Sequence, residues 1–226
     1  MLYFMGAVIV LLVALRRCGL NESLRWTLAI QGVLVWILAG FFYWLAPGEG
    51  KIAESMPLMA CDVLALIAPL SLVIRTRTLR AATYFGAFGL SIQAYVTPAI
   101  DSGPETARYW MFWLVHGNIM ICAIYDLIGE RFRPDRCDLL RAIGFWFVYG
   151  VAMIILDYMT GWYYGYLGPT LPEYVAGSVL KNFGEWPIRP GVMMVFATVV
   201  FVLLWLPWAI AGKFHRTPSP SAARST

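Results

Sequence analysis

The sequence contains few charged residues. Only 13% of its 226 residues are Asp, Glu, Lys or Arg, whereas 60% are apolar. This balance excludes an ordinary soluble globular protein, of which about a quarter of the residues are charged. The formal net charge of +4 arises from short basic clusters between apolar runs, so it does not indicate binding to nucleic acid. We therefore expect an all-α integral membrane protein whose partners are membrane lipids.

Metal-binding residue types are also scarce. The four cysteines have no CxxC spacing, so neither a disulfide framework nor a zinc site is indicated. One of the two histidines lies in the C-terminal tail, which leaves too few ligands for haem or a metal cluster. The last apolar run has no interior lysine to carry retinal, which excludes a microbial rhodopsin. We expect no metal and no cofactor.

Seven apolar runs are predicted to be membrane-spanning helices. They cover residues 1–15, 24–46, 57–74, 81–98, 109–128, 140–163 and 190–212. The first run lacks the basic segment and cleavage site of a signal peptide, so we expect a retained helix. It is shorter than the usual ~20 residues, which leaves an upstream start codon open. We expect one transmembrane helical domain over residues 1–212 and a disordered cytoplasmic tail over residues 213–226.

The basic residues predict the orientation of these spans. Thirteen of the seventeen Lys and Arg residues fall in alternate loops on one side, and four fall on the other. Because basic loops are retained in the cytoplasm, we expect a multi-pass protein of the cell membrane with its N-terminus outside and its C-terminus inside. The outer loop over residues 164–189 carries a capping-box pattern, Thr170 and Glu173, which predicts an interfacial helix over a site or at the headgroups.

Four ionisable side chains lie inside the predicted spans: Asp62, His116, Asp126 and Asp157. Each such group costs at least about 2.5 kcal/mol on insertion scales and usually faces the interior of a bundle. Asp126 lies near the inner end of its span, where we expect it to pair with Arg131 or Arg133.

Three reactive groups share one predicted depth. With a rise of ~1.5 Å per residue, Cys61, His116 and Asp157 lie about 6, 10 and 9 Å below the outer boundary. A thiol, an imidazole and a carboxylate in one place can act as nucleophile, general base and orienting group. The sequence fixes depth but not direction, so ordinary packing roles stay open for all three. We expect Asp62, Asn118 and Trp186 to contact the substrate.

Three segments resemble the YwaF-type bacterial integral membrane proteins, a family related to the eukaryotic transmembrane protein 164. They are MPLMACD at residues 56–62, the pair His116-Gly117, and residues 157–187, which end in FGEWP. The resemblance implies a helical membrane fold and, from the eukaryotic relative, acyl transfer between phospholipids. It also implies that Cys61 accepts the acyl group and that His116 activates it.

The chain departs from the bacterial pattern at three places. Met59 stands where the pattern has a histidine, Asp157 stands where it favours asparagine, and Tyr163-Tyr164 replaces an Asn-Tyr pair. The missing histidine leaves open whether the site is catalytic.

Three functions are compatible with these residues. The first is a lipid acyltransferase or esterase that uses Cys61 and His116, with Asp157 or Asn118 as the orienting group. The second is a small-solute or proton-coupled transporter that uses the buried ionisable groups as a polar path. The third is a non-catalytic membrane scaffold, for which ten Trp and twelve Tyr residues supply packing surface.

Overall fold

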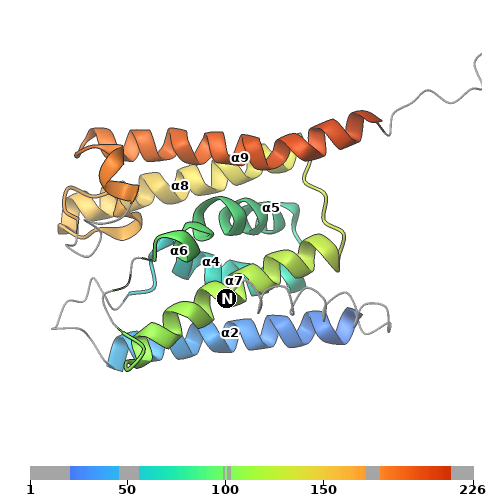
Figure 1. Ribbon diagram of the computed structural model, residues 1–226, viewed down its shortest axis with the longest axis horizontal. Helices are drawn as coiled ribbons and strands as arrows, with labels where there is room; N and C mark the ends of the chain where they lie inside the picture. The colour runs from blue at the N-terminus through green and yellow to red at the C-terminus, as the bar shows by residue number, and fades with distance from the viewer. Residues whose placement is uncertain (1–20, 46–55, 99, 101–102, 172–178, 215–226) are drawn as a thin grey trace, which may run out of the picture.

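The computed structural model describes residues 21–45, 56–98, 100, 103–171 and 179–214 (Figure 1). Within these ranges the regular structure is helical and contains no strand, which confirms the all-α prediction. The predicted helix at 1–15 and the predicted tail beyond Phe214 lie outside the described residues.

Each predicted apolar run within these ranges corresponds to a helical segment. The segments are α2 (Asn21–Leu45), α4 (Ala60–Ile74), α5 (Arg77–Gly86), α6 (Gln93–Val96), α7 (Ala107–Ile128), α8 (Arg136–Thr160) and α9 (Ile188–Phe214). A π-helical turn, η2 (Ala87–Ser91), connects α5 to α6, so the predicted run at 81–98 is not one regular helix. Two short 3-10 turns, η3 (Tyr164–Tyr166) and η5 (Val179–Phe183), lie between α8 and α9.

Four of the described helices are long and apolar enough to cross a membrane: Glu22–Phe42, Ala107–Ile128, Arg136–Thr160 and Ile188–Ala211. Large apolar side chains on α2, α8 and α9, among them Leu34, Val148 and Leu203, are exposed on the outside of the bundle. Such a surface is stable in lipid and not in water. The chain is therefore an integral membrane protein, and the count of seven spans stays a prediction.

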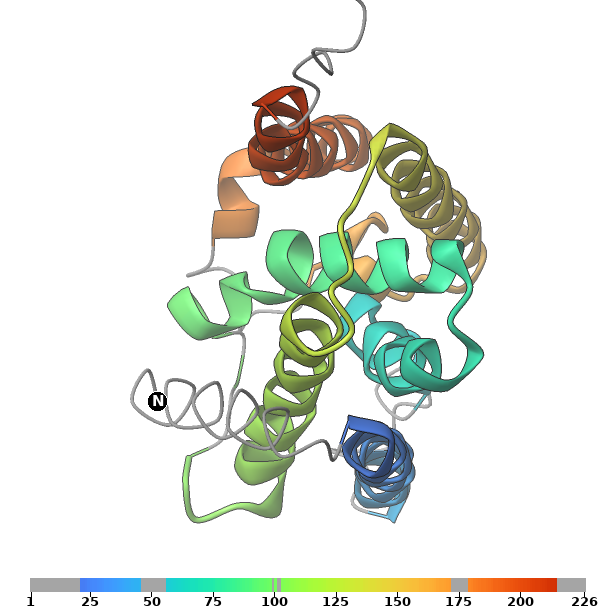
Figure 2. The same cartoon turned by 90° about the vertical axis from the view of Figure 1, so that its right-hand side faces the viewer.

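The helices pack in two outer groups. α2 packs against α4 and α7, while α8 packs against α9. The α5–η2–α6 segment lies between the two groups (Figures 1 and 2). Buried apolar side chains fill the junction, among them Leu64, Phe85, Ile119, Trp146 and Phe201.

Close helix packing depends on small residues where α2 meets its neighbours. A Cβ atom on Gly32 would lie 2.6 Å from Pro69 Cβ and 2.9 Å from Asn118 Nδ2. Real side chains do not approach so closely, so glycine permits the contact between α2, α4 and α7.

One end of the bundle is joined by ion pairs. Arg75 at the end of α4 pairs with Glu130 after α7 at 2.5 Å, and Arg77 at the start of α5 pairs with Asp138 of α8. Asp138 is completely buried and also accepts a hydrogen bond from Arg141 at 2.8 Å. These contacts hold the end of α4 and the starts of α5 and α8 at the same end of the bundle. α4 therefore runs toward this end, whereas α5 and α8 run away from it.

Asp126 has a different partner from the one predicted. Its carboxylate pairs with Arg80 of α5, with an Nη2–Oδ1 distance of 2.8 Å. Arg133 instead donates to the backbone carbonyls of Leu127 and Phe132. The prediction was wrong because the loop arginine is close in sequence, whereas packing of α5 against α7 brings Arg80 close in space.

Candidate active site

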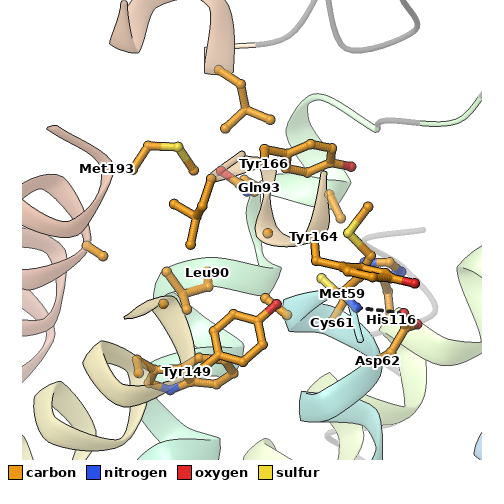
Figure 3. Close-up of a pocket in the computed structure, with 18 of the residues that line it drawn as sticks. Met59, Cys61, Asp62, Leu90, Gln93, His116, Tyr149, Tyr164, Tyr166 and Met193 are labelled. Atoms are coloured by element: carbon orange, nitrogen blue, oxygen red, sulfur yellow. Dashed lines mark hydrogen bonds between the residues drawn. The ribbon is translucent and has the colours of Figure 1, made fainter. Parts of the chain in front are cut away.

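A cavity of about 330 Å³ lies among the helices, toward the end opposite the ion pairs. Mostly apolar side chains line it, from α2, α4, η2, α6, α7, α8, α9 and the connection between α8 and α9. Figure 3 shows part of its lining. The polar lining residues include Cys61, Asp62, Gln93, Arg108, His116, Tyr149, Tyr163, Tyr164 and Tyr166.

Cys61 lies in the first turn of α4 and lines the cavity. Two hydrogen bonds fix the backbone around it. The Tyr149 hydroxyl of α8 donates to Leu58 O at 2.8 Å, and Trp36 Nε1 of α2 donates to Asp62 O at 3.1 Å. The buried hydroxyl of Ser91, in the π-helical turn, lies beside the thiol. The position of the thiol is therefore set by three other helical segments.

His116 lies in the middle of α7, is 5% exposed and lines the same cavity. Its Nδ1 atom is 2.7 Å from the carbonyl oxygen of Phe112. Because a carbonyl can only accept, Nδ1 carries the proton and Nε2 is the basic nitrogen. The rings of Phe112 and Tyr95 flank the imidazole, with centroid distances of 4.2 and 6.3 Å.

Cys61 and His116 are brought to one side of the cavity, together with Asp62 and Tyr164 (Figure 3). No hydrogen bond joins the thiol to the imidazole. Hydrogen bonds between catalytic groups often tighten only when substrate binds, so this geometry is compatible with a thiol–imidazole pair.

Asp62, predicted to contact substrate, lines the cavity next to Cys61. Its Oδ2 atom accepts a hydrogen bond from the backbone N–H of Met59 at 3.2 Å. A carboxylate here satisfies a backbone donor at the start of α4 and interacts favourably with the helix dipole. Asp62 therefore stabilises the turn that carries Cys61.

Asp157 is not brought to His116. It is completely buried outside the cavity lining, and its Oδ1 atom accepts a hydrogen bond from Tyr164 N at 2.9 Å. A Cβ atom on Gly168 would lie 2.6 Å from Asp157 Cβ, so the returning chain packs closely on this carboxylate. The predicted contact with the imidazole is replaced by the Phe112 carbonyl, which is four residues away on the same helix.

Asn118 and Trp186 also lie away from the cavity lining. Asn118 faces α2 beside Gly32, and its Oδ1 atom is 4.0 Å from the sulfur of Cys122. Trp186 stacks on Tyr158 at a centroid distance of 5.9 Å. Neither side chain is placed to contact a molecule next to Cys61.

The loop between α8 and α9 and the first turn of α9 supply residues that sequence reasoning missed. The Tyr164 hydroxyl is buried without a hydrogen-bond partner, and burial followed by the nearby charge of Asp62 raises the pKa of Tyr164 to about 12. Arg189 is 4% exposed and donates from Nε to Tyr166 O at 3.1 Å and from Nη2 to Gly168 O. The departure at Tyr163-Tyr164 was visible in the sequence, but its place in the cavity was not.

The predicted interfacial helix in this loop is described only in part. Thr170 donates to Gly161 O at 3.0 Å, while Glu173 lies outside the described residues. Leu180 in η5 is buried and lines the cavity, and the Phe183 ring packs against Phe196 of α9 with centroids 5.1 Å apart. This part of the loop thus covers one wall of the cavity.

Comparison with known proteins identifies a family. Neither the curated proteins nor the solved structures contain a match. A sequence model of the TMEM164 family matches residues 1–205, which confirms the resemblance to transmembrane protein 164, and the chain therefore belongs to this family.

Proposed function

We propose that the protein is a membrane acyltransferase that moves an acyl group between lipids through a thioester on Cys61. The observation that carries the proposal is that a thiol from α4 and an imidazole from α7 line one largely apolar cavity. The orientation predicted from the basic residues puts this cavity in the outer half of the cell membrane. Lipid esters lie at that level, and lipid tails can reach it from the bilayer.

The reaction proceeds in two steps. His116 Nε2 takes the thiol proton, and the Cys61 sulfur attacks the ester carbonyl of the donor lipid. The bond from the carbonyl carbon to the glycerol oxygen breaks, and His116 returns the proton to that oxygen. A lysolipid leaves, and the acyl group stays on Cys61 as a thioester.

The second step is the reverse of the first, with the hydroxyl of an acceptor lysolipid in place of the glycerol oxygen that left. The hydroxyl of an acceptor lysolipid attacks the thioester carbonyl while His116 takes its proton. The carbon–sulfur bond breaks, and the proton passes from His116 to the sulfur, which restores the Cys61 thiol. If water replaces the acceptor, the same residues act as an esterase. The apolar lining favours transfer, because it limits access of water to the thioester.

Two residues that line the cavity are suited to the negative charges of this reaction, which are the oxygen formed during attack and the lipid phosphate. The Tyr164 hydroxyl is a buried donor without a partner, as needed to stabilise the oxygen that becomes negative during attack. Arg108, near the start of α7, supplies a cation in the cavity wall that suits a lipid phosphate.

The alternative readings have less support. A proton-coupled transporter needs free ionisable groups along a path, yet Asp126 pairs with Arg80 and Asp157 accepts from the backbone of Tyr164. A scaffold does not need a thiol and an imidazole in one cavity.

The proposal predicts that Cys61→Ala abolishes acyl turnover. Purified protein in liposomes with a labelled phospholipid donor and a lysolipid acceptor should form labelled diacyl product, whereas the variant should not. His116→Ala should lower the rate by about a hundredfold or more, because it removes the general base.

Cys122→Ala is the matched control, because Cys122 is fully buried away from the cavity lining. It should turn over lipid like the wild type. Turnover by Cys61→Ala at the wild-type rate would refute the proposal. If only a Met59→His variant is active, the wild-type site has lost catalysis and the scaffold reading is favoured.

A further inference from the structure

The cavity extends well beyond the thiol and the imidazole. Met193 of α9 lies on the opposite side of the cavity from Cys61 and His116 (Figure 3). The part of the lining contributed by α8 and α9 is apolar over most of its length. We call it the α8–α9 limb, and its residues are Ile143, Phe147, Gly150, Met194, Ala197 and Phe201.

The limb lies close to the outside of the bundle. Phe147 lines the cavity and is also 55% exposed on the outside of the bundle. At this point, therefore, the wall of the cavity is only one side chain thick. The exposed faces of α8 and α9 on either side carry large apolar residues, among them Val148, Ile155 and Val199. These faces contact lipid tails in a membrane.

One position in the wall of the limb is a glycine with close neighbours. Gly150 is buried, and a Cβ atom there would lie 3.0 Å from Met194 Cε and 3.7 Å from Leu167 Cδ1. Methionine can move aside because its side chain is unbranched and flexible. A branched side chain at position 150, by contrast, would fill the limb.

We propose that the α8–α9 limb binds the acyl chain of the lipid substrate, which reaches Cys61 from the bilayer between α8 and α9, and that Gly150 and Ala197 set the chain length accepted. The inference rests on the proposed function, since the chain bound here is the one whose carbonyl meets Cys61. An acyl chain fits because the limb is lined mostly by apolar side chains, lies one side chain, Phe147, from the surrounding lipid, and belongs to the same cavity as the Cys61 thiol.

The test compares donors that differ only in chain length. Wild-type protein and Gly150→Leu are supplied with dihexanoyl or dipalmitoyl phosphatidylcholine and the same acceptor. The ratio of long-chain to short-chain turnover should fall about tenfold or more in Gly150→Leu, as pocket volume changes usually cause. Ala197→Phe, which narrows the limb from α9, should lower the same ratio.

Gly144→Leu is the matched control, because Gly144 is on the same helix, exposed and without atoms within 4 Å of an added Cβ. It should keep the wild-type ratio. An unchanged ratio in both Gly150→Leu and Ala197→Phe would overturn the inference while the proposed function stands. A wild-type protein that transfers neither chain would instead overturn the proposed function.

A second measurement does not need activity. A phosphatidylcholine with a diazirine near the end of a long acyl chain, incorporated into the liposomes, should label Met194, which lines the cavity. Gly150→Leu should reduce this labelling, and Gly144→Leu should not. Labelling confined to the exposed face of α9 in the wild type would contradict the inference.

Discussion

The Asp157 carboxylate is one of the groups that hold the chain after α8. Asp157 Oδ1 accepts from Tyr164 N at 2.9 Å, and this turn brings Tyr164 to the cavity. This hydrogen bond requires an acceptor oxygen and no negative charge. Asparagine, which the bacterial pattern favours at this position, supplies the same oxygen.

Replacement of Asp157 should therefore distinguish a structural from a catalytic role. Asp157→Asn should keep most of the activity and stability, whereas Asp157→Ala should lose about 1 to 3 kcal/mol of unfolding free energy because a buried N–H is left unpaired. Denaturation in detergent and acyl turnover measure the two effects. Met159→Ala, at a neighbouring site that is 78% exposed, is the control. Loss of activity in a stable Asp157→Asn protein would mean that the charge takes part in catalysis.

At the residue scale, the sequence predicted which residue types belong to the site better than it predicted which way their side chains point. Cys61 and His116 were expected in one site because they share a depth, and Asp62 was expected to contact the substrate. All three line one cavity. Asp157 shares the predicted depth of Cys61 and His116, but it packs against other neighbours, as does Asn118. Depth follows from the rise per residue, while direction depends on how each helix is rotated by its packing.

At the scale of elements, α5 and α7 are joined by a buried ion pair. Arg80 and Asp126 have side chains that are 12% and 4% exposed, and the Arg80 guanidinium lies 4.6 Å from the centroid of the Phe132 ring. Removal of one partner leaves an uncompensated charge in a medium that solvates it poorly.

Asp126→Ala should lower the unfolding free energy by about 3 to 5 kcal/mol. Arg131→Ala should change it little, because Arg131 is exposed and the structure gives the pairing role to Arg80. Chemical denaturation of both variants in the same detergent makes the comparison. Equal losses would show that the loop arginine is a true partner of α7.

The sequence predicted the positions of the helices well, but it did not predict where a helix is interrupted by an irregular turn. Apolar runs mark α2, α4, α7, α8 and α9 to within a few residues, because the length of a span is set by the bilayer. The π-helical turn η2 was missed, since an extra residue in a turn leaves no clear mark on hydropathy. That turn carries Ser91 to the Cys61 thiol, and π-helical turns are frequent at functional sites.

At the scale of the whole molecule, the helix ends that carry most of the described arginines lie together, joined by ion pairs. The same residues predicted a cytoplasmic face from the excess of positive charge. Cys137, next to this cluster at the start of α8, is exposed, so it can report which side of the membrane the cluster faces.

A variant with Cys137 as its single cysteine should react with a membrane-impermeant maleimide in inverted vesicles but not in intact cells. Cys18→Ser, Cys61→Ser and Cys122→Ala make this variant, and a further Cys137→Ser change is the negative control. Labelling of intact cells would reverse the predicted orientation and place the cavity on the cytoplasmic side.

The central claim is that Cys61 carries the acyl group, and peptide mass spectrometry after incubation with a phospholipid donor tests it most directly. The account predicts an added acyl mass on the Cys61 peptide that neutral hydroxylamine removes, as expected of a thioester. The mass should be absent in His116→Ala and should disappear from the wild type when lysolipid acceptor is added. Diacyl product formed while the Cys61 peptide stays unmodified throughout a time course would contradict it.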